Sequence, residues 1–178
     1  FNPRCFSTTL NGVFSKNELF AVRRDFYDVC TQLFAESFFK QIQEWCRRRN
    51  LLSVGHLPGE DDPSSHATYF GHFFRLARYL DAPGIDAIWR QIFPGKDNLN
   101  YPKFASSSAH HHSRLLSITE SFAVYGHGLT LEEMKWITDF QFVRGINLMA
   151  PMAIYYSTDG ERIFSTMVQL GHGNPLWS

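Results

Sequence analysis

Short apolar runs alternate with helical patterns along most of this chain, and this alternation constrains the fold more than any other feature. The runs are LLSVGHL at 51–57, PGIDAIW at 83–89, LLSITE at 115–120 and GINLMAPM at 145–152. Each is short and nearly continuous in apolar character, as strands of a helix-covered parallel sheet are. The pattern predicts an α/β fold of parallel β/α units, equal to half of a (β/α)8 barrel.

The segments between these runs carry helical spacing. The longest, Glu18 to Arg49, has apolar residues at steps of three and four, and shorter helices are predicted over 67–80, 102–114 and 130–143. Most of the 17 phenylalanines fall on such stripes, so we expect them in the core. Residues 1–17 and 153–178 are predicted as loop. The 178 residues are thus expected to form a single partial domain with its β/α units in 18–152.

Composition excludes several classes of function. Lysine plus arginine equals aspartate plus glutamate, 17 each, so the balance favours neither nucleic acid nor an anionic membrane. No apolar run reaches the length of about 18 residues that a membrane span needs. The three cysteines, Cys5, Cys30 and Cys46, are predicted to be free thiols, which favours a reducing compartment such as the cytoplasm.

Acidic and imidazole side chains mark the ends of the predicted strands. Glu120 ends LLSITE, His56 and Glu60 close and follow LLSVGHL, and Asp86 belongs to the PGIDAIW segment. Functional residues of parallel β/α folds lie at this carboxyl edge, so the carboxyl groups of Glu60 and Glu120 are expected to converge on one pocket. In the ordinary alternative, Glu120 forms a salt bridge or caps a helix.

The HLPGEDD stretch places His56, Glu60, Asp61 and Asp62 within seven positions. Such oxygens can bind a hard cation such as calcium or hydrogen-bond to sugar hydroxyls, although the spacing is not that of an EF-hand loop. A solvated acidic loop is the alternative.

Other candidates lie on helices and in loops. His110, His111 and His112 point in three directions around a helix, so they cannot easily share one ion, but one of them can face the site. Aromatic rings near presumed loops can stack on sugar rings, or can serve only in packing; they are Tyr125, Trp136, Tyr155 and Trp177.

Three stretches together resemble a known family. RRDFYDVCTQLFAESFFKQIQEWCRRRNLLSVGHLPGE, ASSSAHHHSRLLSITESF and LTLEEMKWITDFQFVRGINLMAPMAIYYS are similar to the catalytic barrel of glycoside hydrolase family 106, whose characterised members are α-L-rhamnosidases. The resemblance extends from about residue 20 to residue 177. Its most specific parts are the A-S-S-x-A-H block before a strand ending in T-E-S-F, and the later G-I-N.

The resemblance implies an inverting hydrolysis of a terminal glycosidic bond in a carbohydrate substrate, with calcium bound near the sugar. By position, Glu120 matches the general base, and Glu60 matches a second acidic residue that contacts calcium or sugar and assists catalysis. The remaining expected substrate contacts are His56, Asp61, His110, Tyr125, Trp136 and Asn147. The family also allows a periplasmic or secreted location.

One family feature is missing. No D-S-x-E-like motif supplies the general acid, and the acidic residues before residue 50 all lie on or at the start of the long helix. If the four apolar runs correspond to strands five to eight, the partner of this chain is the N-terminal half of the same barrel, and the chain alone is expected to be inactive. Two alternatives remain: a non-catalytic carbohydrate-binding or assembly module derived from such a barrel, and a complete small α/β protein with an unrelated role.

Overall fold

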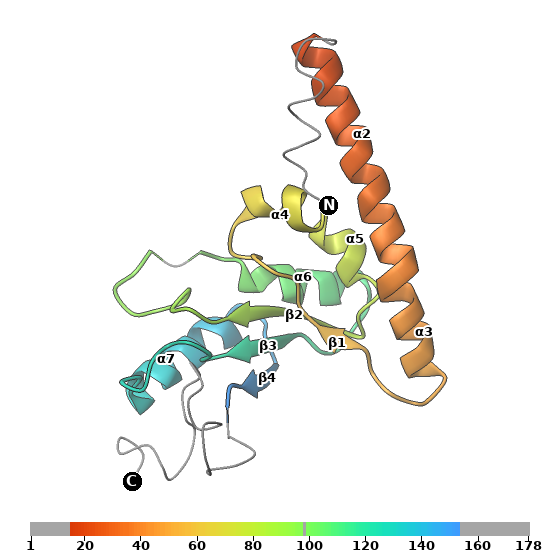
Figure 1. The fold of residues 1–178 in the computed structure, drawn as a ribbon. Coiled ribbons are helices and arrows are strands. Elements are labelled where there is room, and N and C mark those ends of the chain that lie inside the picture. Colours follow the sequence, from red (N-terminus) through yellow and green to blue (C-terminus); the bar gives the residue numbers. More distant parts are fainter. Residues whose placement is uncertain (1–14, 98, 154–178) are drawn as a thin grey trace, which may run out of the picture.

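The computed structural model describes residues 15–97 and 99–153. Its helical elements are α2 (Lys16–Phe34), the π-helical segment η1 (Ala35–Lys40), α3 (Gln41–Arg47), α4 (Pro63–Tyr69), α5 (Phe73–Ala77), α6 (Pro102–His111) and α7 (Leu131–Phe142) (Figure 1). Its strands are β1 (Val54–Gly55), β2 (Ala82–Ala87), β3 (Ile118–Ser121) and β4 (Leu148–Pro151). Most of the loops predicted over 1–17 and 153–178, with Cys5, Tyr155 and Trp177, lie outside the described residues, whereas residues 16 and 17 belong to α2 instead of the predicted loop.

The four strands form one parallel sheet in the order β1-β2-β3-β4, curled like half of a barrel (Figure 1). This arrangement confirms the predicted α/β class with parallel β/α units. The strands approach closely at Gly84, where an added Cβ would lie 2.6 Å from the Gly55 carbonyl oxygen and 2.7 Å from the Ile118 side chain. A side chain larger than hydrogen would therefore push β1 and β3 away from β2.

Helices cover the outer face of the curled sheet. Helix α6 packs against β2, and α5 packs against α6. On β3, Thr119 and Ser121 point towards α7, where both contact the fully buried Gln141. Because side chains alternate along a strand, Glu120 points to the opposite, inner face.

The long predicted helix is confirmed, since α2, η1 and α3 run on without a break from 16 to 47. Its buried positions are four residues apart: Thr31, Ala35, Phe39 and Gln43. The π-helical segment has a wider turn than an α-helix, which keeps positions four apart on one side.

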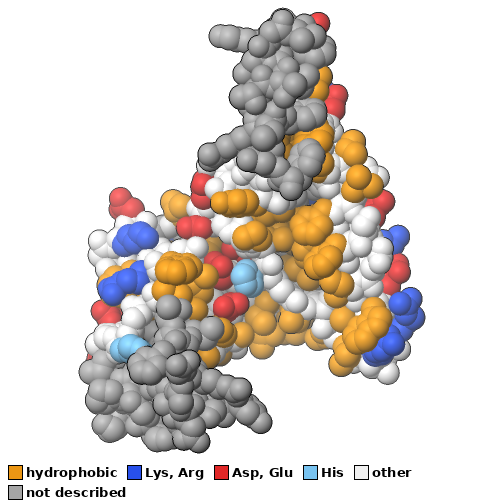
Figure 2. Space-filling model, in the orientation of Figure 1, with side chains coloured by type: hydrophobic (Ala, Val, Ile, Leu, Met, Phe, Trp, Pro, Cys, Tyr) orange, Lys and Arg blue, Asp and Glu red, His pale blue; other side chains and the backbone are white. Residues whose placement is uncertain are grey.

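The predicted burial of its apolar stripe is wrong. Side chains on that stripe are 41–57% exposed: Val29, Leu33, Phe38, Ile42 and Trp45. We call these five residues the apolar helix face. Figure 2 shows apolar side chains exposed over this helix and over the surface below it. The phenylalanines near this end of the chain are thus only partly core, whereas Phe70, Phe73 and Phe122 are buried as expected.

The run at 51–57 is also less buried than predicted. Only Val54 and Gly55 form a strand, and Leu51, Leu52 and Val54 are 50–60% exposed. The physical reason is position in the sheet, because β1 is an edge strand with no neighbour on its outer side among the described residues. The predicted strand 145–152 shortens to β4 at the other edge, where Leu148 is 37% exposed.

The helix predicted over 67–80 is in fact two short helices, and the loop predicted over 58–65 ends early. Asp62 caps α4 by accepting a hydrogen bond from the Ser64 amide, and Pro63 takes the first helical position. Gly71 separates α4 from α5 with a left-handed φ of 85°. An added Cβ there would lie 1.7 Å from the Thr31 hydroxyl, so only glycine fits beneath α2.

The later elements agree closely with the sequence. Helices α6 and α7 and strand β3 lie within the predicted segments or one residue beyond them. The capping box of α7 is present, with the Thr130 hydroxyl accepting from the Glu133 amide and the Glu133 carboxylate accepting from the Thr130 amide. In the described part of the chain, no helix combines the length and apolar character that crossing a membrane requires.

Candidate functional site

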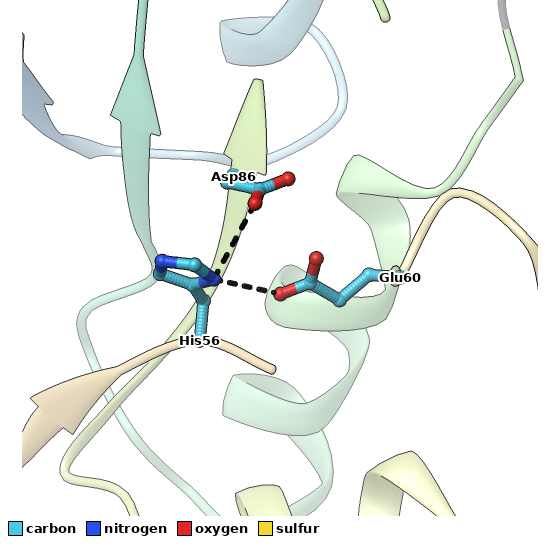
Figure 3. Close-up of side chains that lie close together, drawn as sticks. All are labelled: His56, Glu60 and Asp86. Carbon is cyan, nitrogen blue, oxygen red and sulfur yellow. Dashed lines mark hydrogen bonds and ion pairs between the residues drawn. The ribbon is translucent and has the colours of Figure 1, made fainter. Parts of the chain in front are cut away.

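His56 is the centre of a cluster of carboxyl groups at the carboxyl end of the sheet. Its Nδ1 lies 3.2 Å from Glu60 Oε1 and 3.7 Å from Asp86 Oδ2, and its Nε2 lies 3.1 Å from Glu120 Oε2. Figure 3 shows the side chains of Glu60 and Asp86 both directed at the same ring nitrogen of His56. The carboxyl groups of residues 60 and 120 therefore lie at the two nitrogens of one imidazole, which confirms that they are near each other; that they line one pocket stays a prediction.

Parallel strand order explains this meeting. Asp86 on β2 and Glu120 on β3 pair directly in the sheet, so their side chains project side by side from its inner face. His56 follows the last residue of β1, and the turn after it brings Glu60 back towards the sheet. The Leu57 amide donates to Glu60 Oε1 over 2.7 Å and fixes that carboxylate.

The cluster is largely buried. Glu60 is fully buried and Asp86 is 5% exposed, whereas His56 and Glu120 keep about a third of their side chains exposed. Among the described residues, neither Glu60 Oε2 nor Asp86 Oδ1 has a hydrogen-bond partner. Burial of carboxylate oxygens without partners costs free energy, and a cation or a ligand hydroxyl bound to these oxygens would reduce that cost.

The surroundings shift the pKa values of two of these groups. The hydrogen bond to Glu60 raises the pKa of His56 to about 9, against an opposing effect of burial. Burial raises the pKa of Asp86 to about 7, and the negative charge of Glu60 adds to this effect. At neutral pH the imidazole is therefore protonated, and Asp86 is poised to exchange a proton.

A buried polar network supports Glu120 from behind. Thr119 Oγ1 donates to Gln141 Oε1 over 2.6 Å, and Gln141 Nε2 donates to Ser121 Oγ and to the Ile137 carbonyl, each over 3.2 Å. These bonds join the two neighbours of Glu120 to α7. They hold β3 rigidly and so keep the Glu120 carboxylate in a fixed position.

The backbone is unusual directly after the two central strands. Trp89 and Arg90 follow β2 with φ of 53° and 57°, and Phe122 and Val124 follow β3 with φ of 79° and 60°. Positive φ is rare for non-glycine residues, especially bulky or β-branched ones, and such strain gathers at functional sites. The position of these strained residues at the carboxyl edge of the sheet supports the assignment of this edge as the candidate functional site.

Two further residues belong to this neighbourhood. Asp61 is partly exposed, and its charge contributes to the raised pKa of Asp86. Asp86 itself was noted at the sequence level without an assigned role. The signal available in the sequence was the place of Asp86 in an apolar run. The position of Asp86 directly opposite Glu120 is known only from the pairing of β2 with β3.

Two aromatic candidates are used in packing. Tyr125 is buried, and its hydroxyl donates to the Ile92 carbonyl over 2.7 Å, so it supports the loops after β2 and β3 from within the core. Trp136 stacks on Phe140 along α7, with ring centroids 5.4 Å apart. Burial raises the pKa of Tyr125 to about 12 and the charge of Asp86 adds to this effect, so this ring lies near the His56 cluster as part of its packing.

His110 and Asn147 are likewise not brought to the cluster. His110 is exposed at the end of α6, just before the chain enters β3. Asn147 precedes β4, where its Oδ1 accepts from the Ser117 amide and its Nδ2 donates to the Leu115 carbonyl. Both positions are at the amino ends of strands, whereas His56 and Glu120 lie at the carboxyl ends.

A metal-like arrangement of donor atoms is present. His56, Glu60 and Asp86 each offer one ligand atom, and these atoms lie within 4.8 Å of one another. The two carboxylates suit the predicted calcium, which takes oxygen ligands. The imidazole nitrogen between them does not suit calcium, so the donor set as a whole does not fit that ion.

Comparisons with protein-family models, with curated proteins and with solved structures found no match to this chain. The resemblance to glycoside hydrolase family 106 therefore stays a prediction.

Proposed function

We propose that this chain is the C-terminal half of a glycoside hydrolase barrel similar to the inverting α-L-rhamnosidases, and that Glu120 is its general base. In this proposal the strands β1 to β4 correspond to strands five to eight of a TIM-type barrel. The carbohydrate substrate lies over the inner edge of the sheet, where the side chains of His56, Asp86 and Glu120 meet.

One observation carries the proposal: Glu120, on an inner strand and partly exposed, shares His56 with the fully buried Glu60. A general base must be reachable by water and firmly held. Exposure of about a third of the Glu120 side chain meets the first need. The hydrogen bond to His56 and the Gln141 network behind β3 meet the second.

The residues then take distinct roles. Glu120 removes a proton from water as the water oxygen attacks the anomeric carbon. An acid supplied by the other half of the barrel gives a proton to the departing oxygen, which balances the step. His56 orients Glu120 through the Nε2 atom of the imidazole, and Glu60 holds His56 in place through the Nδ1 atom of the same ring.

The partner in this proposal is the other half of the barrel. Support comes from the surfaces that the described residues leave open: the outer edge of β1 with Leu51, Leu52 and Val54, and the apolar helix face. Open strand edges and large exposed apolar patches mark interaction surfaces. Further β/α units would pair with the edge and cover the helix.

The test compares two glutamate variants in the full-length protein that contains this chain. Glu120→Gln should lower kcat on an aryl α-L-rhamnoside by about 10³-fold, since it removes the base but keeps the shape of the side chain. Glu132→Gln, on the exposed first turn of α7, is the matched control and should keep full activity. Activity of Glu120→Gln equal to that of the parent would exclude Glu120 as the base.

A non-catalytic assembly module is the second candidate, and the exposed apolar helix face favours it. It predicts that the full-length protein has no glycosidase activity but that a partner binds across α2 and α3. Loss of partner binding on mutation of that helix, with no turnover of any aryl glycoside, would support this candidate over the first.

A further inference from the structure

The His56 cluster has the features of a metal site rather than of an ordinary acidic patch. Its three potential ligand atoms come from three separate segments: the end of β1, the following turn, and β2. Two of the three side chains are more than nine-tenths buried. Figure 3 shows the two carboxylates on the Nδ1 side of the imidazole, facing the same space.

Each buried carboxylate has one oxygen without a partner. Glu60 Oε2 and Asp86 Oδ1 have no hydrogen-bond donor among the described residues. Two carboxylates so close together and so poorly solvated repel each other, and a single imidazole cannot satisfy both. A divalent cation between them would neutralise both charges and use the unpaired oxygens.

Glu120 holds the imidazole in the form that a metal needs once the cation has displaced the Nδ1 proton that the ring carries at neutral pH. When the Nε2 hydrogen is donated to Glu120 Oε2, 3.1 Å away, the neutral ring carries its lone pair on Nδ1. That lone pair points towards Glu60 and Asp86. A carboxylate that holds the distal nitrogen of a metal-bound histidine is the usual outer-shell arrangement of such sites.

We propose that His56 Nδ1, Glu60 and Asp86 bind a divalent first-row transition ion of the Zn²⁺ or Mn²⁺ type, with Glu120 holding the imidazole from the other side. The nitrogen ligand excludes calcium as the best occupant, because calcium takes oxygen ligands. This proposal does not depend on the glycosidase proposal, because it follows from the donor atoms alone.

The experiment uses the full 178-residue chain, stripped with EDTA and then mixed with ZnCl₂, MnCl₂ or CaCl₂. After gel filtration, metal content is measured by mass spectrometry and the melting temperature by calorimetry. We expect retention of Zn²⁺ or Mn²⁺ in a fixed ratio to the chain, with a higher melting temperature, and no retention of Ca²⁺.

Variants locate the ion. His56→Gln and Asp86→Asn should abolish retention, and Glu120→Gln should weaken the affinity by about 10- to 100-fold while the ligands remain. The control removes the other histidine group: His110→Gln with His111→Gln should bind like the parent. A Co²⁺ absorption spectrum that disappears in His56→Gln would confirm nitrogen ligation without relying on stability.

Three outcomes would overturn the proposal. They are no retained ion, retention of Ca²⁺ in preference to Zn²⁺ and Mn²⁺, and loss of binding in the His110 and His111 control but not in His56→Gln. None of these readouts involves glycoside turnover, so the metal site and the catalytic role of Glu120 can fail independently.

Discussion

His56 joins β1 to β3 across the intervening strand β2, with its Nε2 3.1 Å from Glu120 Oε2. The contact links residues 64 positions apart in the chain. The contact requires parallel strands whose ends are aligned, because only then do the carboxyl ends of three strands lie at the same edge of the sheet. The interaction therefore makes the fold and the candidate site interdependent.

Gln141 is expected to contribute strongly to stability because it is fully buried and bonded to β3. Gln141→Ala should lower the free energy of unfolding by about 2–3 kcal/mol, through unsatisfied hydroxyls on Thr119 and Ser121 and a cavity beside α7. Urea unfolding measures this change. Gln32→Ala, at an exposed position on α2, should change it by less than about 0.5 kcal/mol. Equal effects of the two substitutions would contradict the role given to Gln141.

Asp81 anchors α3 to the sheet and should make stability depend on acid. Its carboxylate accepts hydrogen bonds from Arg47, Gln43 and the Ser53 amide. Burial alone would raise the pKa of Asp81, but the hydrogen bonds from Arg47 and Ser53 outweigh burial and lower it. The stabilising effect is therefore present above the ordinary pKa of aspartate, about 3.9, and is lost as the pH falls through the lower folded-state value.

Asp81→Asn tests this dependence. At pH 7 the substitution should cost about 2–3 kcal/mol, less than for a fully buried pair because Arg47 is half exposed. The difference from the parent should shrink in strongly acidic solution, as followed by urea unfolding across pH. Asp97→Asn, at an exposed position, is the control. A penalty that stays constant into strong acid would show that the charge of Asp81 is not responsible.

The apolar helix face should drive self-association of the isolated chain. Phe38 and Ile42 are 50% and 41% exposed, so changing both to lysine costs little stability but adds charge where a partner would pack. Sedimentation velocity should show oligomers for the parent chain and a shift to monomer for the double variant. Val143→Lys, on a 75% exposed residue after α7, should leave association unchanged. A parent chain that remains monomeric at all concentrations would count against this surface as an interface.

The sequence predicted the elements well where local signals decide them. The capping box at Thr130 and Glu133 and the proline at the start of α6 are local, and both helices begin within one residue of the prediction. The alternation of apolar runs with helices was enough for the parallel sheet. The sequence was enough to predict that Glu60 and Glu120 lie near each other, because the strand ends of such a sheet share one edge.

Tertiary relationships explain the rest. Which side of the long helix is buried depends on η1 and on contacts such as Thr31 with the α4–α5 turn, not on where its apolar residues lie. The role of Asp86 depends on the β2–β3 register. The packing roles of Tyr125 and Asn147 depend on hydrogen-bond partners 30 or more positions away in the chain. None of these relationships has a local sequence signal.

The titration of His56 tests the central claim, that side chains from separate segments form one coupled site. In EDTA-treated protein, NMR of the labelled imidazole should give a pKa of about 9, because the hydrogen bond to Glu60 favours the protonated ring. Glu60→Gln should bring the pKa down towards the ordinary histidine value of about 6.5. A His56 pKa near 6.5 in the parent chain, unaltered by Glu60→Gln, would contradict the account.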